Sequence, residues 1–352
     1  MLIFFNCPVC KDNRWKSIEN YFYSEENKKE QSNKWYLPLS RQIKSLARRL
    51  VLARPRSNTV IYDDPLSSYQ KLRREVLFNV WFKDSQQIEL KTIYCETCGF
   101  ACFRPRPDDK DVTQKYMYLN KHNASWVAQT KNKDQSINKL DQLRAEKVYQ
   151  RCSKFTANTS MSILDYGGAS GNLLIPFRNK NHNCYIIDYD DSTIAGVTKL
   201  GNSIHDALIN KKFDLIIFSH VLEHVSDLGL VRTLRQHLKE DGIIYVEVPQ
   251  EIWAGIAIES DPVTHINFFT LNSLLNLLTS NGFEVLKSEQ TISNYGASFT
   301  EVIWAIAKSS HNKAACLLPA DTNAMLYPSR WYSFKKFCVL LAMKFFARIT
   351  SR

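Results

Sequence analysis

The segment Ile163–Gly171 constrains the fold of this chain more than any other. A short strand-like run leads directly into a turn containing Gly167, Gly168 and Gly171, and a helix-sized segment follows. Glycine permits positive φ angles and lets a ligand approach the backbone closely. The turn lacks the Gly-Lys-Ser/Thr ending of a P-loop and the regular Gly-x-Gly-x-x-Gly spacing of a dinucleotide fingerprint. Asp188 ends the next apolar segment, where a carboxylate can accept both ribose hydroxyls, so the pattern predicts a nucleoside-binding α/β unit.

From Ser162 onward, strand-sized and helix-sized segments alternate, which is typical of a doubly wound, mainly parallel sheet. The expected strands are Ser162–Asp165, Cys184–Asp188, Phe213–Phe218, Ile243–Val248, Glu284–Lys287 and Phe299–Ala307. A helix is expected over Leu271–Ser280, with Thr270 as its N-cap and Asn281-Gly282 at its end. Another helix, over about Asn138–Phe155, bridges this unit to the preceding residues.

The positive charge of the chain lies at its two ends. Residues 1–56 carry 12 Lys or Arg against 5 Asp or Glu, residues 308–352 carry 8 against 1, and the rest carries 26 against 29. An enzyme acting on nucleic acid more often has its positive field around the active site. Basic ends suit an anionic membrane face at least as well, so we do not expect a nucleic-acid partner. We expect four parts: residues 1–107, a helical bridge 108–160, the α/β unit 161–307 and a basic tail 308–352.

Four of the nine cysteines form two Cys-x-x-Cys pairs, Cys7 with Cys10 and Cys95 with Cys98. Two such pairs are typical of a tetrahedral zinc site, which with four thiolates has no open position and is structural. A redox dithiol is the main alternative, although it would need only one pair. The segments Val76–Phe82 and Ile88–Tyr94 alternate like a hairpin that delivers the second pair. Metal-bound thiolates indicate a reducing compartment, and the sequence shows neither a signal-peptide core nor a spanning apolar run, so we expect a cytoplasmic protein.

The glycine turn resembles the Asp-x-Gly-x-Gly-x-Gly loop of class I S-adenosylmethionine-dependent methyltransferases, with Ala169 in place of the middle glycine. The segments Phe213–His224 and Asp241–Pro249 resemble the fourth and fifth strand regions of that family, in the same order. The resemblance implies a Rossmann-like, seven-stranded sheet and S-adenosylmethionine as cofactor. A nicotinamide-dependent enzyme or an empty α/β scaffold is the alternative.

The same resemblance implies roles for individual residues around the cofactor. Asp165 and Gly167 lie at its methionine end, Asp188 holds the ribose, and Asp206 is a candidate on the adenine side. Ser219 and His220 lie at a strand tip beside the sulfonium. The full set of expected cofactor-binding residues is Asp165, Gly167, Gly168, Gly171, Asp188, Asp206 and Ser219.

Two segments contain histidines with a chemical interpretation. His220–His224 formally matches the His-x-x-Glu-His motif of one zinc protease class, but its position at the end of an apolar strand favours the methyltransferase interpretation. His224 is expected to pack locally as the next helix begins, and the role of His220 is left open as a candidate catalytic residue. His265 lies in a segment that resembles the acceptor-facing loop of the family. It can take a proton from a hydroxyl, or be a structural histidine before the helix.

The cysteine pairs, together with Cys98-Gly99-Phe100 and Arg104–Asp108, resemble the zinc ribbon in front of some bacterial sugar-modifying methyltransferases. This resemblance implies a sugar or glycan acceptor in surface polysaccharide synthesis. About 45 residues follow Ala307, which favours O-methylation over C-methylation. An RNA methyltransferase and a non-catalytic binding protein are the alternatives.

Two basic segments with apolar residues, Ser40–Arg54 and Phe334–Ile349, have no place in this scheme. Each is expected to be a helix that packs on the protein or on a partner, or one that lies on an anionic membrane surface. In the second case the enzyme would work at the inner face of the membrane, beside a lipid-linked glycan.

Overall fold

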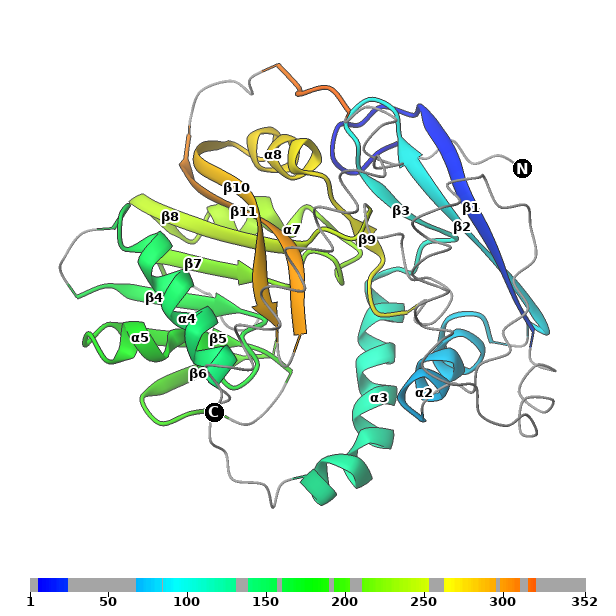
Figure 1. The fold of residues 1–352 in the computed structure, drawn as a ribbon, viewed down its shortest axis with the longest axis horizontal. Coiled ribbons are helices and arrows are strands. Elements are labelled where there is room, and N and C mark those ends of the chain that lie inside the picture. The colour runs from blue at the N-terminus through cyan, green and yellow to red at the C-terminus, as the bar shows by residue number, and fades with distance from the viewer. Residues whose placement is uncertain are drawn as a thin grey trace, which may run out of the picture.

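The computed structural model describes residues 6–24, 68–83, 85–130, 139–156, 160–189, 193–202, 211–252, 263–295, 298–310 and 316–320. Among them are a seven-stranded sheet, which forms the larger unit, and a four-stranded sheet beside it (Figure 1). Both predicted basic helices, Ser40–Arg54 and Phe334–Ile349, lie outside the described residues, as does Asp206.

The seven-stranded sheet has the order β10-β11-β8-β7-β4-β5-β6. Its strands are β4 (Ser162–Tyr166), β5 (Asn183–Ile187), β6 (Val197–Gly201), β7 (Phe213–Ser219), β8 (Leu238–Pro249), β10 (Phe283–Tyr295) and β11 (Ser298–Ser309). The five strands from β6 to β8 are parallel, and β11 is antiparallel to both β8 and β10. This arrangement confirms the predicted Rossmann-like, doubly wound, mainly parallel sheet of seven strands. The six predicted strands are all present, and β6 is the one that the sequence did not reveal.

Helices cover both faces of this sheet, which explains why its strands read as continuous apolar runs. On one face Ile163, Ile217 and Tyr245 pack with α4 (Lys139–Cys152) and α5 (Ile175–Arg178). Their sequence neighbours point to the opposite face and pack with α7 (Leu230–Arg235) and α8 (Leu271–Ser280). A short 3-10 turn, Asn172–Leu174, precedes α5.

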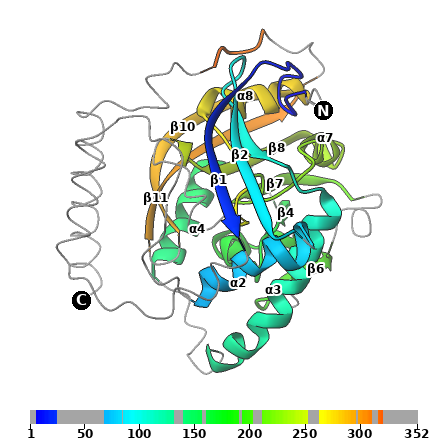
Figure 2. The same cartoon turned by 90° about the vertical axis from the view of Figure 1, so that its right-hand side faces the viewer.

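The four-stranded sheet is antiparallel, with the order β1-β2-β3-β9. Its strands are β1 (Trp15–Ser24), β2 (Gln87–Cys95), β3 (Ala101–Arg104) and β9 (Asn267–Phe268), packed against the helices α2 (Ser68–Val76) and α3 (Asp109–Thr130). The strand β9 comes from the other end of the chain and pairs with β3 through Ala101 opposite Phe268 and Cys102 opposite Asn267. The segment before α8 therefore belongs to both units. The helix α3 lies between the two units (Figure 1) and next to α2 (Figure 2).

Of the two strands predicted to form a hairpin before the second cysteine pair, one is present and the other is a helix. Ile88–Tyr94 lies within β2, but Val76–Phe82 ends α2 and continues as a π-helical turn, Leu77–Trp81. Val76, Leu77 and Val80 are buried on one side of this helical segment. A short apolar run of this kind fits both the two-residue period of a strand and the 3.6-residue period of a helix. The segment forms a helix because its apolar residues pack against α3. The strand that pairs with the other edge of β2 is β1, whose Trp15 lies opposite Cys95.

The N-terminal end of helix α8 has the cap that the sequence predicts. Thr270 has an extended backbone, its hydroxyl accepts the amide of Ser273 at 3.2 Å, and the Ser273 hydroxyl accepts the amide of Thr270 at 2.9 Å. This reciprocal capping box satisfies two amides that would otherwise be buried without partners. Among the described residues, no helix combines the length and apolar character needed to cross a bilayer.

We predict that Thr270→Ala lowers the free energy of unfolding by about 1 kcal/mol, the usual cost of losing a hydroxyl cap. Thr279→Ala is the matched control, because Thr279 lies in the last turn of the same helix and its hydroxyl only donates to the carbonyls of Leu275 and Asn276. Urea unfolding of both variants measures the difference. Equal losses would contradict the capping role.

Candidate active site

The glycine turn lies at the carboxyl end of β4, where the chain order of the parallel strands reverses between β4 and β7. Ligands of doubly wound sheets bind at this switch point. Gly167 and Gly171 have φ angles of 73° and 89°. A Cβ on Gly167 would lie 2.5 Å from Val221 Cγ2, and one on Gly168 would lie 2.5 Å from Asp165 Oδ2. The glycines are therefore required by the packing of the turn itself, before any ligand is considered.

Ala169, the departure from the family loop, also has a left-handed backbone, with φ 47°. Such a conformation costs a residue with a Cβ roughly 1–2 kcal/mol. The amide of Ala169 donates to Asp188 Oδ2 at 2.8 Å. This bond holds the carboxylate at the end of β5 directly against the glycine turn, as the sequence predicts for a ribose-binding group.

Asp165 is buried beneath the turn, with 1% of its surface exposed. Its Oδ2 has no hydrogen-bond partner among the described residues. Burial raises the pKa of Asp165 to about 7, the positive charge of Arg144 opposes this shift, and the charge of Asp188 adds to it. A carboxyl group in this state can take up a cationic ligand group by ionising next to it.

A second buried carboxylate, Glu247, lies in β8 and was not singled out from the sequence. Its exposure is 0%, and four donors surround it. Arg144 Nη2 and Ser219 Oγ both lie 3.2 Å from Oε1, while Arg151 Nη1 and Tyr245 Oη lie 3.1 and 2.7 Å from Oε2. The sequence signal is an acidic residue inside the apolar run of β8, with two arginines seven residues apart on one face of α4.

Ser219, predicted to lie beside the sulfonium, belongs to this network. It accepts a hydrogen bond from Arg144 Nη2 at 2.7 Å and donates its own proton to Glu247. Both hydrogen bonds of the hydroxyl therefore stabilise the end of β7.

His220 follows Ser219 and has a left-handed backbone, with φ 57°. Its Nδ1 lies 3.3 Å from Glu223 Oε1, and its Nε2 lies 3.5 Å from Glu247 Oε1. Burial works against the charged imidazole, but the two carboxylates outweigh burial and raise the pKa of His220. A cation held between two carboxylates orders the strand tip, and it is poorly suited to take up another proton.

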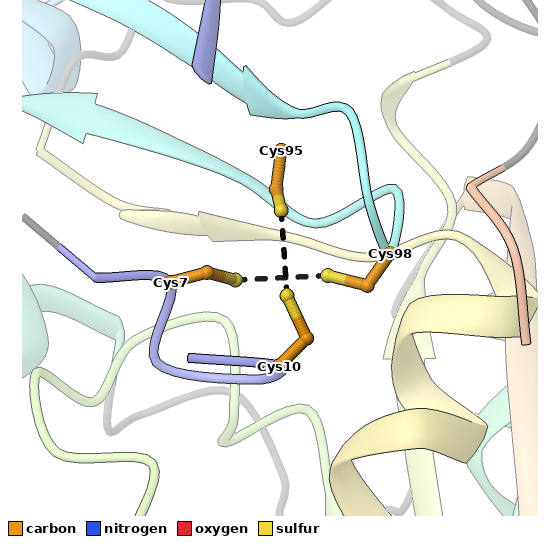
Figure 3. Close-up of side chains that lie close together, drawn as sticks. All are labelled: Cys7, Cys10, Cys95 and Cys98. Atoms are coloured by element: carbon orange, nitrogen blue, oxygen red, sulfur yellow. Dashed lines mark hydrogen bonds between the residues drawn. The ribbon is translucent and has the colours of Figure 1, made fainter. Parts of the chain in front are cut away.

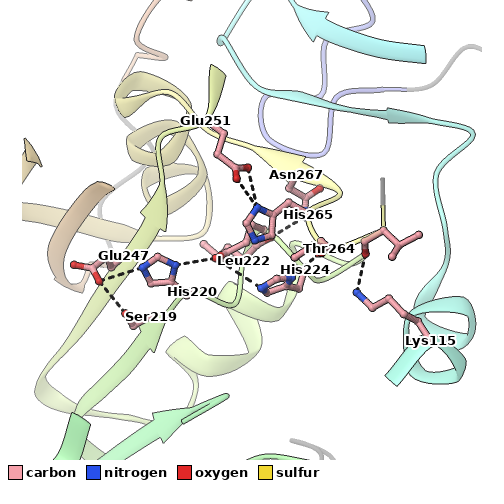
Figure 4. Close-up of polar contacts among 12 residues, drawn as sticks. Lys115, Ser219, His220, Leu222, His224, Glu247, Glu251, Thr264, His265 and Asn267 are labelled. Atoms are coloured by element: carbon pink, nitrogen blue, oxygen red, sulfur yellow. Dashed lines mark hydrogen bonds and ion pairs between the residues drawn. The ribbon is translucent and has the colours of Figure 1, made fainter. Parts of the chain in front are cut away.

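His265 and His224 lie on two neighbouring loops (Figure 4), with their rings 4.7 Å apart. His265 Nδ1 is 2.8 Å from both carboxylate oxygens of Glu251, and His224 Nδ1 is 2.6 Å from the carbonyl of Thr264. His224 lies in a turn at residues 222–224 and not at the start of a helix, since α7 begins only at Leu230. Burial lowers the pKa of His224 to about 3, so this imidazole is neutral.

Two aromatic rings lie next to Asp188. Tyr116, from α3, stacks on Tyr189 with a centroid distance of 5.7 Å and an interplanar angle of 20°. Neighbouring Lys115 is buried and donates to the carbonyl of Val263, in the loop that carries His265. The helical bridge therefore contributes to the wall of the site, which the sequence pattern of α3 did not indicate.

The four predicted zinc ligands come together beside β3 (Figure 3). All four sulfurs lie within 4.8 Å of one another, with 3.6 Å between Cys7 and Cys98 and 3.5 Å between Cys10 and Cys95. Cys7, Cys95 and Cys98 are fully buried, and all four residues are free cysteines. The second pair lies in the turn between β2 and β3, and Gly99 after it has φ 81°.

The sheet order and the glycine turn define the larger unit as a Rossmann-like α/β domain. More particularly, residues 137–288 match the family described as a methyltransferase domain. This match assigns a methyltransferase domain to residues 137–288 and supports an S-adenosylmethionine-dependent enzyme. Comparison with curated proteins gives no match.

Solved structures of methyltransferases have a similar fold. The magnesium protoporphyrin IX methyltransferase of Synechocystis PCC 6803, with bound SAH, is 15% identical over 56% of this chain and 99% of that one, with a TM-score of 0.42. The 1,6-didemethyltoxoflavin-N1-methyltransferase of Burkholderia thailandensis is 13% identical over 60% and 96%, with a TM-score of 0.44. At this level of identity the likeness concerns the fold and not the substrate.

We predict that Asp165→Asn stabilises the protein at pH 8 but not at pH 4. Because the folded pKa is raised from 3.8 to about 7, the stability contributed by the protonated group is present below pH 4 and is lost as the pH rises to 7. A shift of one pKa unit corresponds to about 1.4 kcal/mol. Between pH 4 and pH 8 the free energy of unfolding of Asp165→Asn should therefore rise relative to wild type by on the order of a few kcal/mol. Urea unfolding at a series of pH values measures it, with Asp241→Asn, an exposed residue of β8, as control. A gain that is constant with pH would contradict the assignment.

Proposed function

We propose that this enzyme transfers the methyl group of S-adenosylmethionine to a hydroxyl group of a sugar or glycan, in the synthesis of a surface polysaccharide. The observation that carries the cofactor site is the Asp188 carboxylate bonded to the glycine turn at the switch point of a methyltransferase sheet. The acceptor rests on the resemblance of the cysteine-containing unit to that of sugar-modifying methyltransferases. Polar groups on the His265 loop support it, since they suit an acceptor rich in hydroxyls.

In this proposal Asp188 accepts the ribose hydroxyls, and Gly167, Gly168 and Gly171 let the cofactor lie against the backbone. Asp165 ionises beneath the cationic amino group of the methionine part. Ser219 and His220 define the strand tip beside the sulfonium. Asp206 remains our candidate for the adenine side.

The acceptor oxygen forms a bond to the methyl carbon as the carbon–sulfur bond breaks, and the electron pair stays on sulfur in S-adenosylhomocysteine. Alignment of the two reactants supplies most of the acceleration in such a displacement. The hydroxyl must also lose its proton. Of the two histidines predicted for this role, His265 is better placed than His220, because it contacts one carboxylate, Glu251, whereas His220 is held between two.

We also propose that the four cysteines bind one structural zinc ion. Four sulfurs at about 2.3 Å from a tetrahedral zinc lie about 3.8 Å from one another. The distances of 3.5 and 3.6 Å are close to this value and far longer than a disulfide bond, at about 2.05 Å. Zinc at this position would fix the ends of β2 and β3, and with them the pairing to β9.

For location, we propose a cytoplasmic protein that can lie at the inner face of the membrane, where a lipid-linked glycan is its acceptor. The charge of the two chain ends supports this, since residues 1–56 and 308–352 are both strongly basic. Flotation with anionic liposomes tests the membrane contact. Nucleic acid is not proposed as a partner.

We expect purified protein to bind S-adenosylmethionine in calorimetry and to lose at least tenfold in affinity with Asp188→Ala, which removes the ribose acceptor. Asp241→Ala is the control. Labelled methyl should then pass to nucleotide sugars or glycans and not to RNA. Absence of cofactor binding would overturn the proposal, whereas transfer to RNA alone would overturn only the acceptor.

We expect about one zinc per chain after purification without added metal, and a loss of this zinc together with a lower melting temperature in Cys10→Ser. Cys316→Ser, an exposed cysteine outside the cluster, should change neither quantity. Elemental analysis and thermal unfolding measure both. Zinc-free protein with the stability of the wild type would contradict a structural zinc.

A further inference from the structure

Three side chains beside the β7 tip surround one point. Glu223, His224 and His265 each offer a ligand atom, and these atoms lie within 4.8 Å of one another. Glu223 and His224 come from the turn after β7, and His265 comes from the loop before β9. His224 and His265 lie on the far side of His220 from Ser219 and Glu247 (Figure 4).

The hydrogen bonds of the two imidazoles direct one nitrogen of each into this cluster. A carbonyl only accepts, so the 2.6 Å contact with Thr264 places the proton of His224 on Nδ1 and leaves the lone pair on Nε2, 3.8 Å from Glu223 Oε1. Glu251 does the same for His265, at 2.8 Å from Nδ1. Carbonyl or carboxylate acceptors behind the outer nitrogen are the usual support of metal-binding histidines.

Glu223 supplies the negative charge. It is 1% exposed, and neither carboxylate oxygen has a hydrogen-bond partner among the described residues. Oε1 forms an ion pair with His220 Nδ1 at 3.3 Å, which leaves Oε2 for another cation. A buried carboxylate is costly unless positive charge compensates it, and His220 shares its charge between Glu223 and Glu247.

The two loops that carry these residues are held together. The amides of Ile266 and Asn267 donate to the carbonyl of Glu223 at 2.8 and 3.1 Å. The side-chain amide of Asn267 donates to the carbonyls of Leu222 and Val225 at 2.7 and 2.6 Å. Since Asn267 lies in β9, the four-stranded sheet keeps both loops, and so the three side chains, in place before any ion arrives.

We propose that Glu223, His224 and His265 bind a first-row divalent cation. Two imidazoles and one carboxylate suit Zn²⁺, Mn²⁺, Fe²⁺ or Co²⁺ and leave coordination positions for other oxygen ligands. The site itself does not depend on the nature of the acceptor. Its role rests on the proposed function. A hydroxyl bound to the cation would be more acidic, so its proton could pass to solvent water while His265 serves as a ligand and not as the base.

The test uses protein whose cysteine site is filled with zinc, titrated with Co²⁺ in the absence of cofactor and acceptor. We expect one further equivalent to bind with visible d–d bands and without the near-ultraviolet charge-transfer band of thiolate ligands. Glu223→Gln and His265→Ala should abolish this binding. Glu251→Gln, which changes only the support of His265, should weaken it about tenfold. His237→Ala is the control, since this partly exposed histidine lies outside the cluster.

Binding of Co²⁺ that is equally strong in wild type and His265→Ala, or no binding beyond the cysteine site, would overturn the proposal. Circular dichroism shows whether Glu223→Gln has folded, and the partly exposed His265 gives a second variant if it has not. Because the titration contains no S-adenosylmethionine, its failure leaves the methyltransferase proposal intact. Conversely, cobalt binding in a protein that transfers no methyl to sugars would leave the cation site standing alone.

Discussion

The active edge of the larger sheet depends on the burial of one carboxylate, Glu247. A charge of this kind is tolerated inside a protein only with full compensation, which here comes from Arg144, Arg151, Tyr245 and Ser219. The two arginines hold α4 against β8. Ser219 holds the end of β7 against the same carboxylate. His220, with its left-handed backbone, completes the arrangement by bridging Glu247 to Glu223. The carboxylate thus orders the residues at which cofactor and acceptor are expected to meet.

The pairing of β9 with β3 joins this edge to the cysteine-containing unit. Only two residues of β9 take part, yet Asn267 among them also bonds to the turn that carries Glu223 and His224. Arg106, just after β3, donates to the carbonyls of Val225 and Ser226 in the same turn. The cysteine site is therefore connected through β3 and β9 to the turn after β7 and to the loop that carries His265. The cysteine-containing unit thus has a structural connection to these loops, although it lies away from the glycine turn.

Prediction from sequence succeeded where a pattern is local. The apolar runs located six of the strands, since strands buried on both faces have no polar alternation to obscure them. Thr270 and Asn281-Gly282 delimited α8, because caps are decided by a few neighbouring residues. The pattern failed at Val76–Phe82, where helix and strand periods both fit, and at β6, whose strand is short and mostly half-exposed. Glu247, Arg144, Glu251 and Lys115 were missed because each matters only through a partner distant in the chain.

The sequence by itself determined the glycine turn, the acidic residue that follows it, the two cysteine pairs and the doubly wound class of the sheet. Each of these depends on backbone freedom, ligand type or periodicity, which are properties of a few consecutive residues. Only the tertiary structure decided that His220 lies between two carboxylates, that His265 contacts Glu251, and that Glu223, His224 and His265 lie close together. Protonation and ligand geometry depend on burial and on charges brought together by the fold, and no spacing along the chain records them.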